Sequence, residues 1–163
     1  MKKFIIQVLV LLIVTFGALA FYTQKLPGFT FLSQNQKTTS IKINDQEFKV
    51  EIADNADSRR KGLSGRESLA TDSGVLFVYQ TPDKYIFWMK GVRFPLDFIW
   101  INGSKVVDII KNVPASDPNT SDDILPRYGP NQPVDKILEV NSGFVDKYNI
   151  NIGDQVSIGT TTP

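Results

Sequence analysis

The segment Phe94-Pro-Leu-Asp-Phe-Ile-Trp-Ile101 is followed by Asn102-Gly103 and then by Lys105-Val-Val-Asp-Ile-Ile-Lys111. The apolar, β-branched and aromatic residues on both sides of Asn102-Gly103 predict two strands. Asn-Gly favours a two-residue hairpin turn, because such turns need positive φ angles that these residues tolerate. This stretch therefore predicts an antiparallel hairpin and, with it, a β-rich fold.

Short segments of the same kind occur on both sides of this hairpin. Two short helices are also expected, one capped by Asp54 or Asp57 and one over residues 144–148. Many short strands with few helices predict a mainly β (α+β) domain, built as a compact antiparallel β-barrel or sandwich. The further expected strands are Ile41–Ile43, Phe48–Ile52, Val75–Tyr79, Tyr85–Met89, Ile137–Val140 and Gln155–Ile158.

The N-terminus carries an almost uninterrupted apolar run over residues 4–22, preceded by Lys2 and Lys3. At about 1.5 Å per residue, a helix of this length crosses a hydrocarbon core of roughly 30 Å. The two lysines predict that the N-terminus stays inside and the rest of the chain lies outside the cytoplasmic membrane. Alternatively, Ala18-Leu19-Ala20 is a cleavage site and the run is a signal peptide, which would make the protein secreted.

The chain therefore divides into three parts. Residues 1–24 form the membrane anchor or signal peptide, and residues 25–39 form a linker that is rich in polar residues. Residues 40–159 form the β-rich globular domain. Nothing in the sequence indicates an oligomeric state.

The composition excludes several kinds of chemistry. The chain has 163 residues, with 18 basic and 17 acidic side chains and neither His nor Cys. A nearly neutral chain lacks the clustered positive charge that nucleic-acid binding needs. Without His and Cys there is no Ser-His-Asp triad, thiol nucleophile or Cys-based zinc site. We therefore expect no cofactor, no metal and no nucleic-acid partner.

Several ordered blocks of this sequence resemble one known family. The chain is similar, over about residues 41–158, to the family catalogued as domain of unknown function 192. That resemblance implies a small, mostly antiparallel β-barrel-like domain, often exported in bacteria and archaea. It implies no established activity, so no catalytic residue is carried over. The blocks are Asp57–Leu69, Gly74–Val78, Phe87–Trp100, Val106–Asp108, Leu138–Gly143 and Ile152–Asp154.

Asp97 is the first candidate for a functional side chain, because it interrupts an apolar strand. Burial of a carboxylate is costly unless a partner compensates for it. Lys90, Arg93 or Arg66 is available as that partner. Two interpretations follow: a ligand pocket with Trp88 as its aromatic wall, or a structural ion pair with Trp88 in the core.

Glu139 is the second candidate, since it lies within the apolar segment Ile137–Val140. If Glu139 and Asp97 faced one cavity, they would form a carboxylate pair of the kind that performs acid/base chemistry on sugars. Alternatively, Glu139 faces solvent by simple alternation, or it bonds to the backbone of the turn at Ser142-Gly143.

The N-terminal apolar run and these candidate residues together favour a membrane-tethered or exported binding domain. The expected ligand is a small polar molecule or an envelope glycan, held in a cleft lined by Arg66, Trp88, Lys90, Asp97 and Glu139. Two alternatives stay open at this point. One is a carboxylate-dependent hydrolase or lyase that acts on saccharide, and the other is a purely structural interaction module.

Overall fold

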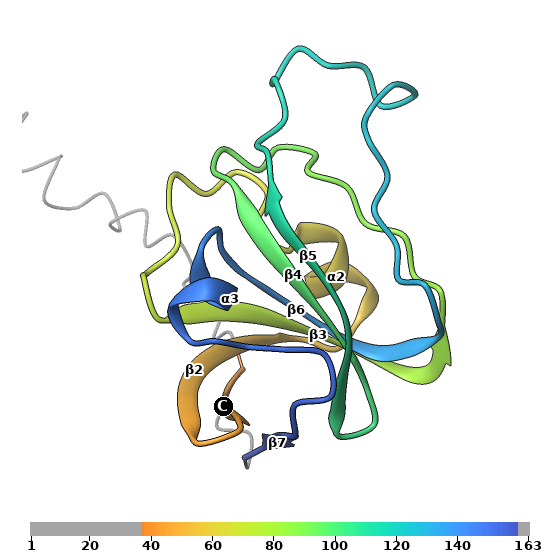
Figure 1. The fold of residues 1–163 in the computed structure, drawn as a ribbon. Helices are drawn as coiled ribbons and strands as arrows, with labels where there is room; N and C mark the ends of the chain where they lie inside the picture. The colour runs from red at the N-terminus through yellow and green to blue at the C-terminus, as the bar shows by residue number, and fades with distance from the viewer. Residues whose placement is uncertain (1–36, 160–163) are drawn as a thin grey trace, which may run out of the picture. The chain divides into compact units, whose positions relative to one another are not determined.

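The computed structural model describes residues 37–159, so the expected anchor and most of the linker lie outside the described residues. Among the residues that it describes, no helix has both the length and the hydrophobicity to cross a bilayer. The domain is mainly β with two short helices, as predicted (Figure 1). Its elements are β1 (Thr38–Ile43), β2 (Gln46–Ala53), α2 (Ala56–Lys61), β3 (Ser73–Asp83), β4 (Leu96–Asn102), β5 (Lys105–Val113), β6 (Val134–Asn141), α3 (Phe144–Lys147) and β7 (Val156–Ile158).

The strands form one seven-stranded sheet in the order β5-β4-β6-β3-β2-β1-β7. The sheet is mostly antiparallel, as the family resemblance implied, with one exception: β2 and β3 run parallel. The connection between them contains α2 and crosses over the sheet, as parallel neighbours require. The other neighbouring strands pair antiparallel.

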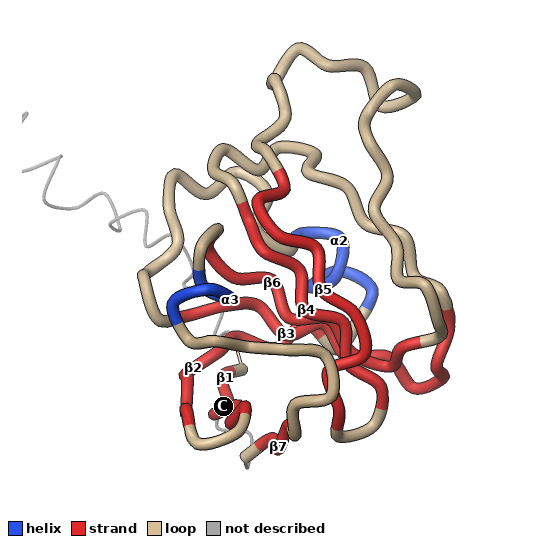
Figure 2. Tube along the Cα trace, in the orientation of Figure 1, coloured by secondary structure: helices blue, strands red, loops and turns tan. Residues whose placement is uncertain are grey.

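The sheet curls into a half-barrel, so that its two edges approach each other (Figures 1 and 2). The segment that leads into β7 bonds to the start of β5. Val106 N–H donates to the Asp154 carbonyl at 3.0 Å, and Val156 N–H donates to the Ser104 carbonyl at 2.8 Å. The barrel-like architecture therefore depends on a contact between the last strand and the central hairpin.

Alternation along β4 separates two apolar cores. Ile99 and Ile101 pack on one face with the α3 residues Phe144 and Val145. Leu96, Phe98 and Trp100 pack on the opposite face with Leu63, Met89 and Val92. Because successive strand residues point to opposite faces, a fully buried strand needs cover on both sides. Residues 56–63 and 84–95 supply the cover on the second face.

The segment Tyr85–Met89 is not the strand that its sequence predicted. Within it, only Phe87 makes a β-bridge, to Tyr128. The ring of Phe87 packs edge-on against Phe77 at 4.9 Å and Trp100 at 5.6 Å between centroids. Phe87 therefore packs on the face of the sheet from a loop (Figure 2).

Two local expectations also need correction. The residue that caps α2 is Asn55, whose side chain accepts hydrogen bonds from the backbone of Asp57 and Ser58. In the central hairpin, Asn102 still pairs with Lys105, so the turn residues are Gly103 and Ser104. Gly103 has a φ of 59°, whereas Asn102 does not adopt a positive φ. The amide of Asn102 instead donates to the carbonyl of Pro133 at 3.1 Å.

Candidate functional site

A pocket of about 280 Å³ lies on the face of the sheet that carries α2. Its walls come from the end of α2, from β3 and from the loop over residues 86–92, and Glu139 of β6 also lines it. We call this the acid pocket. The side chains that give it its chemical character are Arg59, Arg60, Lys61, Tyr79, Trp88, Lys90 and Glu139.

Glu139 is the buried acid of this pocket, with 5% of its surface exposed. Burial raises the pKa of its carboxyl to about 8, and the charge of Arg66 opposes that shift. No residue in the described range 37–159 forms a hydrogen bond or ion pair with this carboxyl. At neutral pH Glu139 is therefore mostly protonated, and its O–H is a donor available to a molecule in the pocket.

Arg66 lies on the same face of the sheet but is engaged elsewhere. Its guanidinium binds both carboxylate oxygens of Glu51, at 2.7 and 2.5 Å. Glu51 is opposite Val75, and Val75 is opposite Glu139, so the two acids occupy one cross-strand row. The hydrogen bonds to Glu51 raise the pKa of Arg66, and the charge of Glu139 adds to this. Arg66 therefore lowers the pKa of Glu139 through the charge of its guanidinium beside the pocket.

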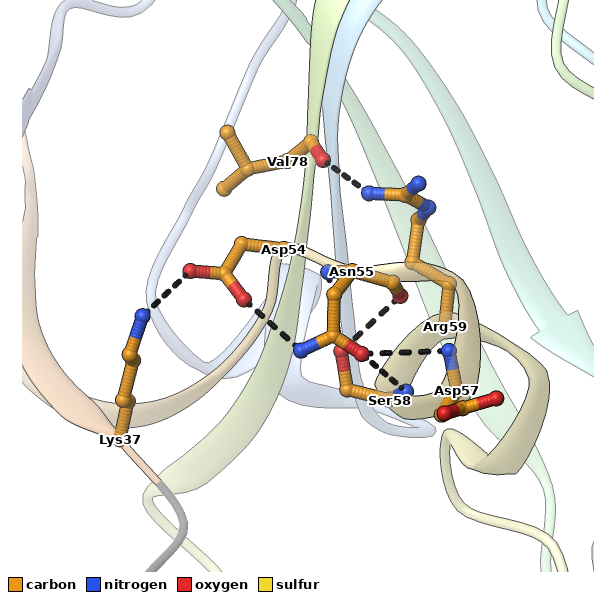
Figure 3. Close-up of polar contacts among 7 residues, drawn as sticks. All are labelled: Lys37, Asp54, Asn55, Asp57, Ser58, Arg59 and Val78. Atoms are coloured by element: carbon orange, nitrogen blue, oxygen red, sulfur yellow. Dashed lines mark hydrogen bonds and ion pairs between the residues drawn. The ribbon is translucent and has the colours of Figure 1, made fainter.

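Arg59 is fixed at the pocket wall by two contacts. Its guanidinium donates to the Val78 carbonyl at 3.0 Å and lies 4.8 Å from the ring centroid of Tyr79. Figure 3 shows how the Asn55 cap starts α2 so that Arg59 points to the sheet. Burial raises the pKa of the Tyr79 hydroxyl. Tyr79 therefore remains a neutral donor in the physiological range.

Trp88 and Lys90 form the outer part of the pocket. Trp88 is 40% exposed, and the guanidinium carbon of Arg127 lies 4.1 Å from its ring centroid. Lys90 pairs with Asp122 of the long loop over residues 114–133. Both side chains are therefore accessible to solvent at the mouth of the pocket.

Asp97 lies elsewhere. Its carboxylate accepts from Asn112 N–H at 2.9 Å and from Val145 N–H at 3.0 Å, and the side chain is fully buried. These bonds join β4 to the end of β5 and to the first turn of α3. In the described part of the chain its partners are backbone N–H groups, while Lys90 pairs with Asp122 and Arg66 with Glu51.

The structure thus brings Trp88, Lys90 and Glu139 together in one pocket, with Arg66 close by and Asp97 apart. Sequence reasoning did not single out Tyr79 or the basic run Arg59-Arg60-Lys61, which also line the pocket. Arg59 contacts β3 through the Val78 carbonyl, whereas Arg60 and Lys61 are exposed, and no spacing in the sequence distinguishes the three.

Comparisons with known proteins agree on the fold. A family model described as Uncharacterized ACR (DUF192, domain of unknown function 192) matches residues 39–158. No curated protein matches the chain. A crystal structure from Sinorhizobium meliloti 1021, provisionally described as a transcription regulator, has 27% identity and a TM-score of 0.65. The match spans 75% of this chain and 93% of the Sinorhizobium chain.

A protein of unknown function from Novosphingobium aromaticivorans DSM 12444 has the same fold, with 24% identity and a TM-score of 0.69. The match spans 77% of this chain and 89% of that one. The family model covers residues that lie within the described domain. With the family model matching residues 39–158, the chain belongs to the DUF192 family.

Proposed function

We propose that this domain binds a small acidic saccharide in the acid pocket. The observation that carries the proposal is Glu139, a buried carboxyl that faces the pocket with no hydrogen-bond partner among residues 37–159. A ligand in the pocket can therefore bond to this carboxyl without displacing a protein partner. Binding sites commonly keep such a group for recognition.

The charges around the pocket favour an anionic ligand. Arg59, Arg60, Lys61 and Lys90 line it, whereas its one acid, Glu139, has a pKa of about 8 and is mostly neutral at pH 7. Positive groups around a partly closed pocket raise the local concentration of anions. A sugar acid combines a carboxylate for these cations with hydroxyls that accept from Glu139 and Tyr79.

We further propose that this binding takes place outside the cytoplasm. The apolar run over residues 4–22, preceded by Lys2 and Lys3, supports a single-pass anchor with the domain outside, or a cleaved leader that releases it. An envelope glycan with uronic acid units would be in reach of either form. Protease treatment of intact spheroplasts should then degrade the domain, whereas protection of the domain would contradict this location.

The test is a binding titration of the full-length protein with D-galacturonate and with D-galactose, which lacks the carboxylate. We expect galacturonate to bind at least about tenfold more tightly, since a charge-assisted hydrogen bond contributes roughly 1.5–3 kcal/mol. Glu139→Leu, which removes the donor at similar size, and Arg59→Gln should both weaken binding. The matched control is Lys49→Gln, because Lys49 is exposed on β2 and lies outside the pocket.

Failure of the folded protein to bind either sugar would overturn this proposal and favour a purely structural interaction module. Equal affinity for the two sugars would overturn the acidic-ligand assignment.

Catalysis is the second candidate function, and Glu139 is again the observation that favours it. A carboxylic acid that keeps its proton near neutral pH is a suitable general acid for a saccharide hydrolase or lyase. Detection of new reducing ends or of an unsaturated product during the titration, with loss in Glu139→Gln, would distinguish catalysis from binding alone.

A further inference from the structure

A second pocket, of about 310 Å³, lies beside the acid pocket. The loop over residues 114–133 forms one wall, and the turns at Ser64-Gly65 and Gly91 form the other. We call this the loop pocket. Part of its lining is not shared with the acid pocket. The side chains in that part are those of Arg93, Ser116, Asp117, Pro118, Thr120, Asp122 and Leu125.

The two pockets are neighbours. Ser64, Lys90 and Val92 line both of them. Two adjacent cavities with a common wall form one groove when that wall is low or movable. Ligand sites for drug-sized molecules have volumes of roughly 300–1,000 Å³, so each pocket alone is near the lower end of that range and the pair lies within it.

Lys90 is the exposed part of the common wall, so it is where a ligand can pass from one pocket to the other. Its side chain is 52% exposed and pairs with Asp122, which is 56% exposed. Ion pairs between such exposed groups are weak, because solvent screens both charges. A ligand carboxylate can therefore replace Asp122 at Lys90 at little cost, and the replacement would place an anionic unit at the junction of the pockets.

The loop pocket differs in chemistry from the acid pocket. It contains the hydroxyls of Ser116 and Thr120 and charges of both signs, including Asp117 and Arg93. The Ser116 hydroxyl is fixed by donating to the Met89 carbonyl at 2.6 Å, which holds the loop against the residues next to Lys90. Such a mixed polar lining offers partners both to the hydroxyls and, at Arg93, to the carboxylate of a neighbouring acidic sugar unit.

We propose that the acid pocket and the loop pocket are two subsites of one groove, which takes a linear acidic oligosaccharide of at least two units. One unit occupies the acid pocket, the chain passes Lys90, and the next unit lies against residues 116–125. This inference rests on the proposed function, because it extends the ligand assigned to the acid pocket.

The test compares D-galacturonate with its linear dimer and trimer in titrations of the full-length protein. The dimer should bind at least about tenfold more tightly than the monomer, which corresponds to about 1.4 kcal/mol from the second subsite. Thr120→Trp, which fills the loop pocket, should reduce the affinity for the dimer to that for the monomer. It should leave the affinity for the monomer unchanged.

Asn119→Trp is the matched control, because Asn119 is adjacent in the loop, exposed, and absent from the lining of the pocket. It should bind all three sugars as the wild type does. Equal affinity for monomer and dimer, or an equal loss in both Trp variants, would overturn the two-subsite groove while the acid pocket stands. Absence of binding by all three sugars would instead overturn the proposed function itself.

Discussion

Asp97 and Glu139 lie on adjacent strands, but their side chains point to opposite faces of the sheet. Asp97 is opposite Val140, whereas Glu139 is opposite Phe98, so the two acids differ by one position in register. A shift of one residue reverses the face of a strand side chain. The two carboxyls therefore do not form a catalytic pair, and each has its own surroundings and its own expected response to substitution.

For Asp97 we predict that Asp97→Asn is milder than Asp97→Leu. Leucine leaves the N–H groups of Asn112 and Val145 without their acceptor, at about 1–3 kcal/mol each. Asparagine keeps one acceptor oxygen, so it should lose about half of the stability that leucine loses. Urea denaturation of both variants measures the difference. Equal losses would mean that shape and packing, rather than these two hydrogen bonds, determine the role of Asp97.

For Glu139 we predict a pH-dependent contribution to stability. The ordinary pKa of the carboxyl is 4.5, and in the folded protein it is about 8. Between these values the folded state holds a proton that the unfolded state has released. The free energy of unfolding therefore falls as pH rises through this window, by up to about 1.4 kcal/mol per unit.

The Glu139→Gln variant tests this contribution, because its amide cannot ionise. Relative to the wild type, it should gain stability progressively between pH 5 and pH 8, a range that lies inside the window from 4.5 to about 8. Glu47→Gln, at an exposed position on β2, should run parallel to the wild type over the same range. A difference between Glu139→Gln and the wild type that does not change with pH would show that the folded carboxyl is ionised throughout.

Arg66 should control the ionisation of Glu139 through its charge. Arg66→Gln removes a cation that lowers the pKa of Glu139, so that pKa should rise further above its value of about 8. Arg66→Lys keeps the charge and should leave the pKa of Glu139 nearly unchanged. It should still reduce stability by about 1 kcal/mol, because lysine cannot bind both oxygens of Glu51. Carboxyl carbon NMR titration and thermal melts give the two quantities, and identical titrations in both variants would exclude an effect of charge.

In the central hairpin, Gly103→Val should destabilise the protein by about 1–2 kcal/mol, because an L-residue resists a left-handed backbone. The φ of Gly103 is 59°, and an added Cβ would meet no atom within 4 Å, so the cost is conformational. Ser104→Val is the control, since Ser104 does not have a positive φ. Equal melting temperatures for the two variants would contradict this assignment of the turn.

The strands were predictable where β-branched and aromatic residues dominate a segment. The run from Phe94 to Ile101 and its partner after Gly103 could be placed from local pattern alone, because β-branched and aromatic residues prefer a pleated surface. Tyr85–Met89 has the same composition, yet Phe87 packs on the sheet instead of joining it. Local pattern does not distinguish these two uses of an aromatic residue.

The site was less predictable than the strands. Trp88, Lys90 and Glu139 stood out as polar or aromatic residues in unusual settings, and they do line one pocket. The separation of Asp97 from Glu139 depends on how β4 and β6 align, which is a long-range property. The contribution of Arg59 depends on where α2 lies on the sheet, and no spacing within residues 56–61 encodes that position.

The closing contact between β7 and the rest of the sheet has a consequence for the order of folding. β7 ends at residue 158 and pairs with β1, which begins at residue 38, so almost the whole domain separates the two partners in sequence. Contacts of such long range form slowly, because the loop between them must be closed first. The edge of β1 therefore stays open until the final residues of the domain have been synthesised.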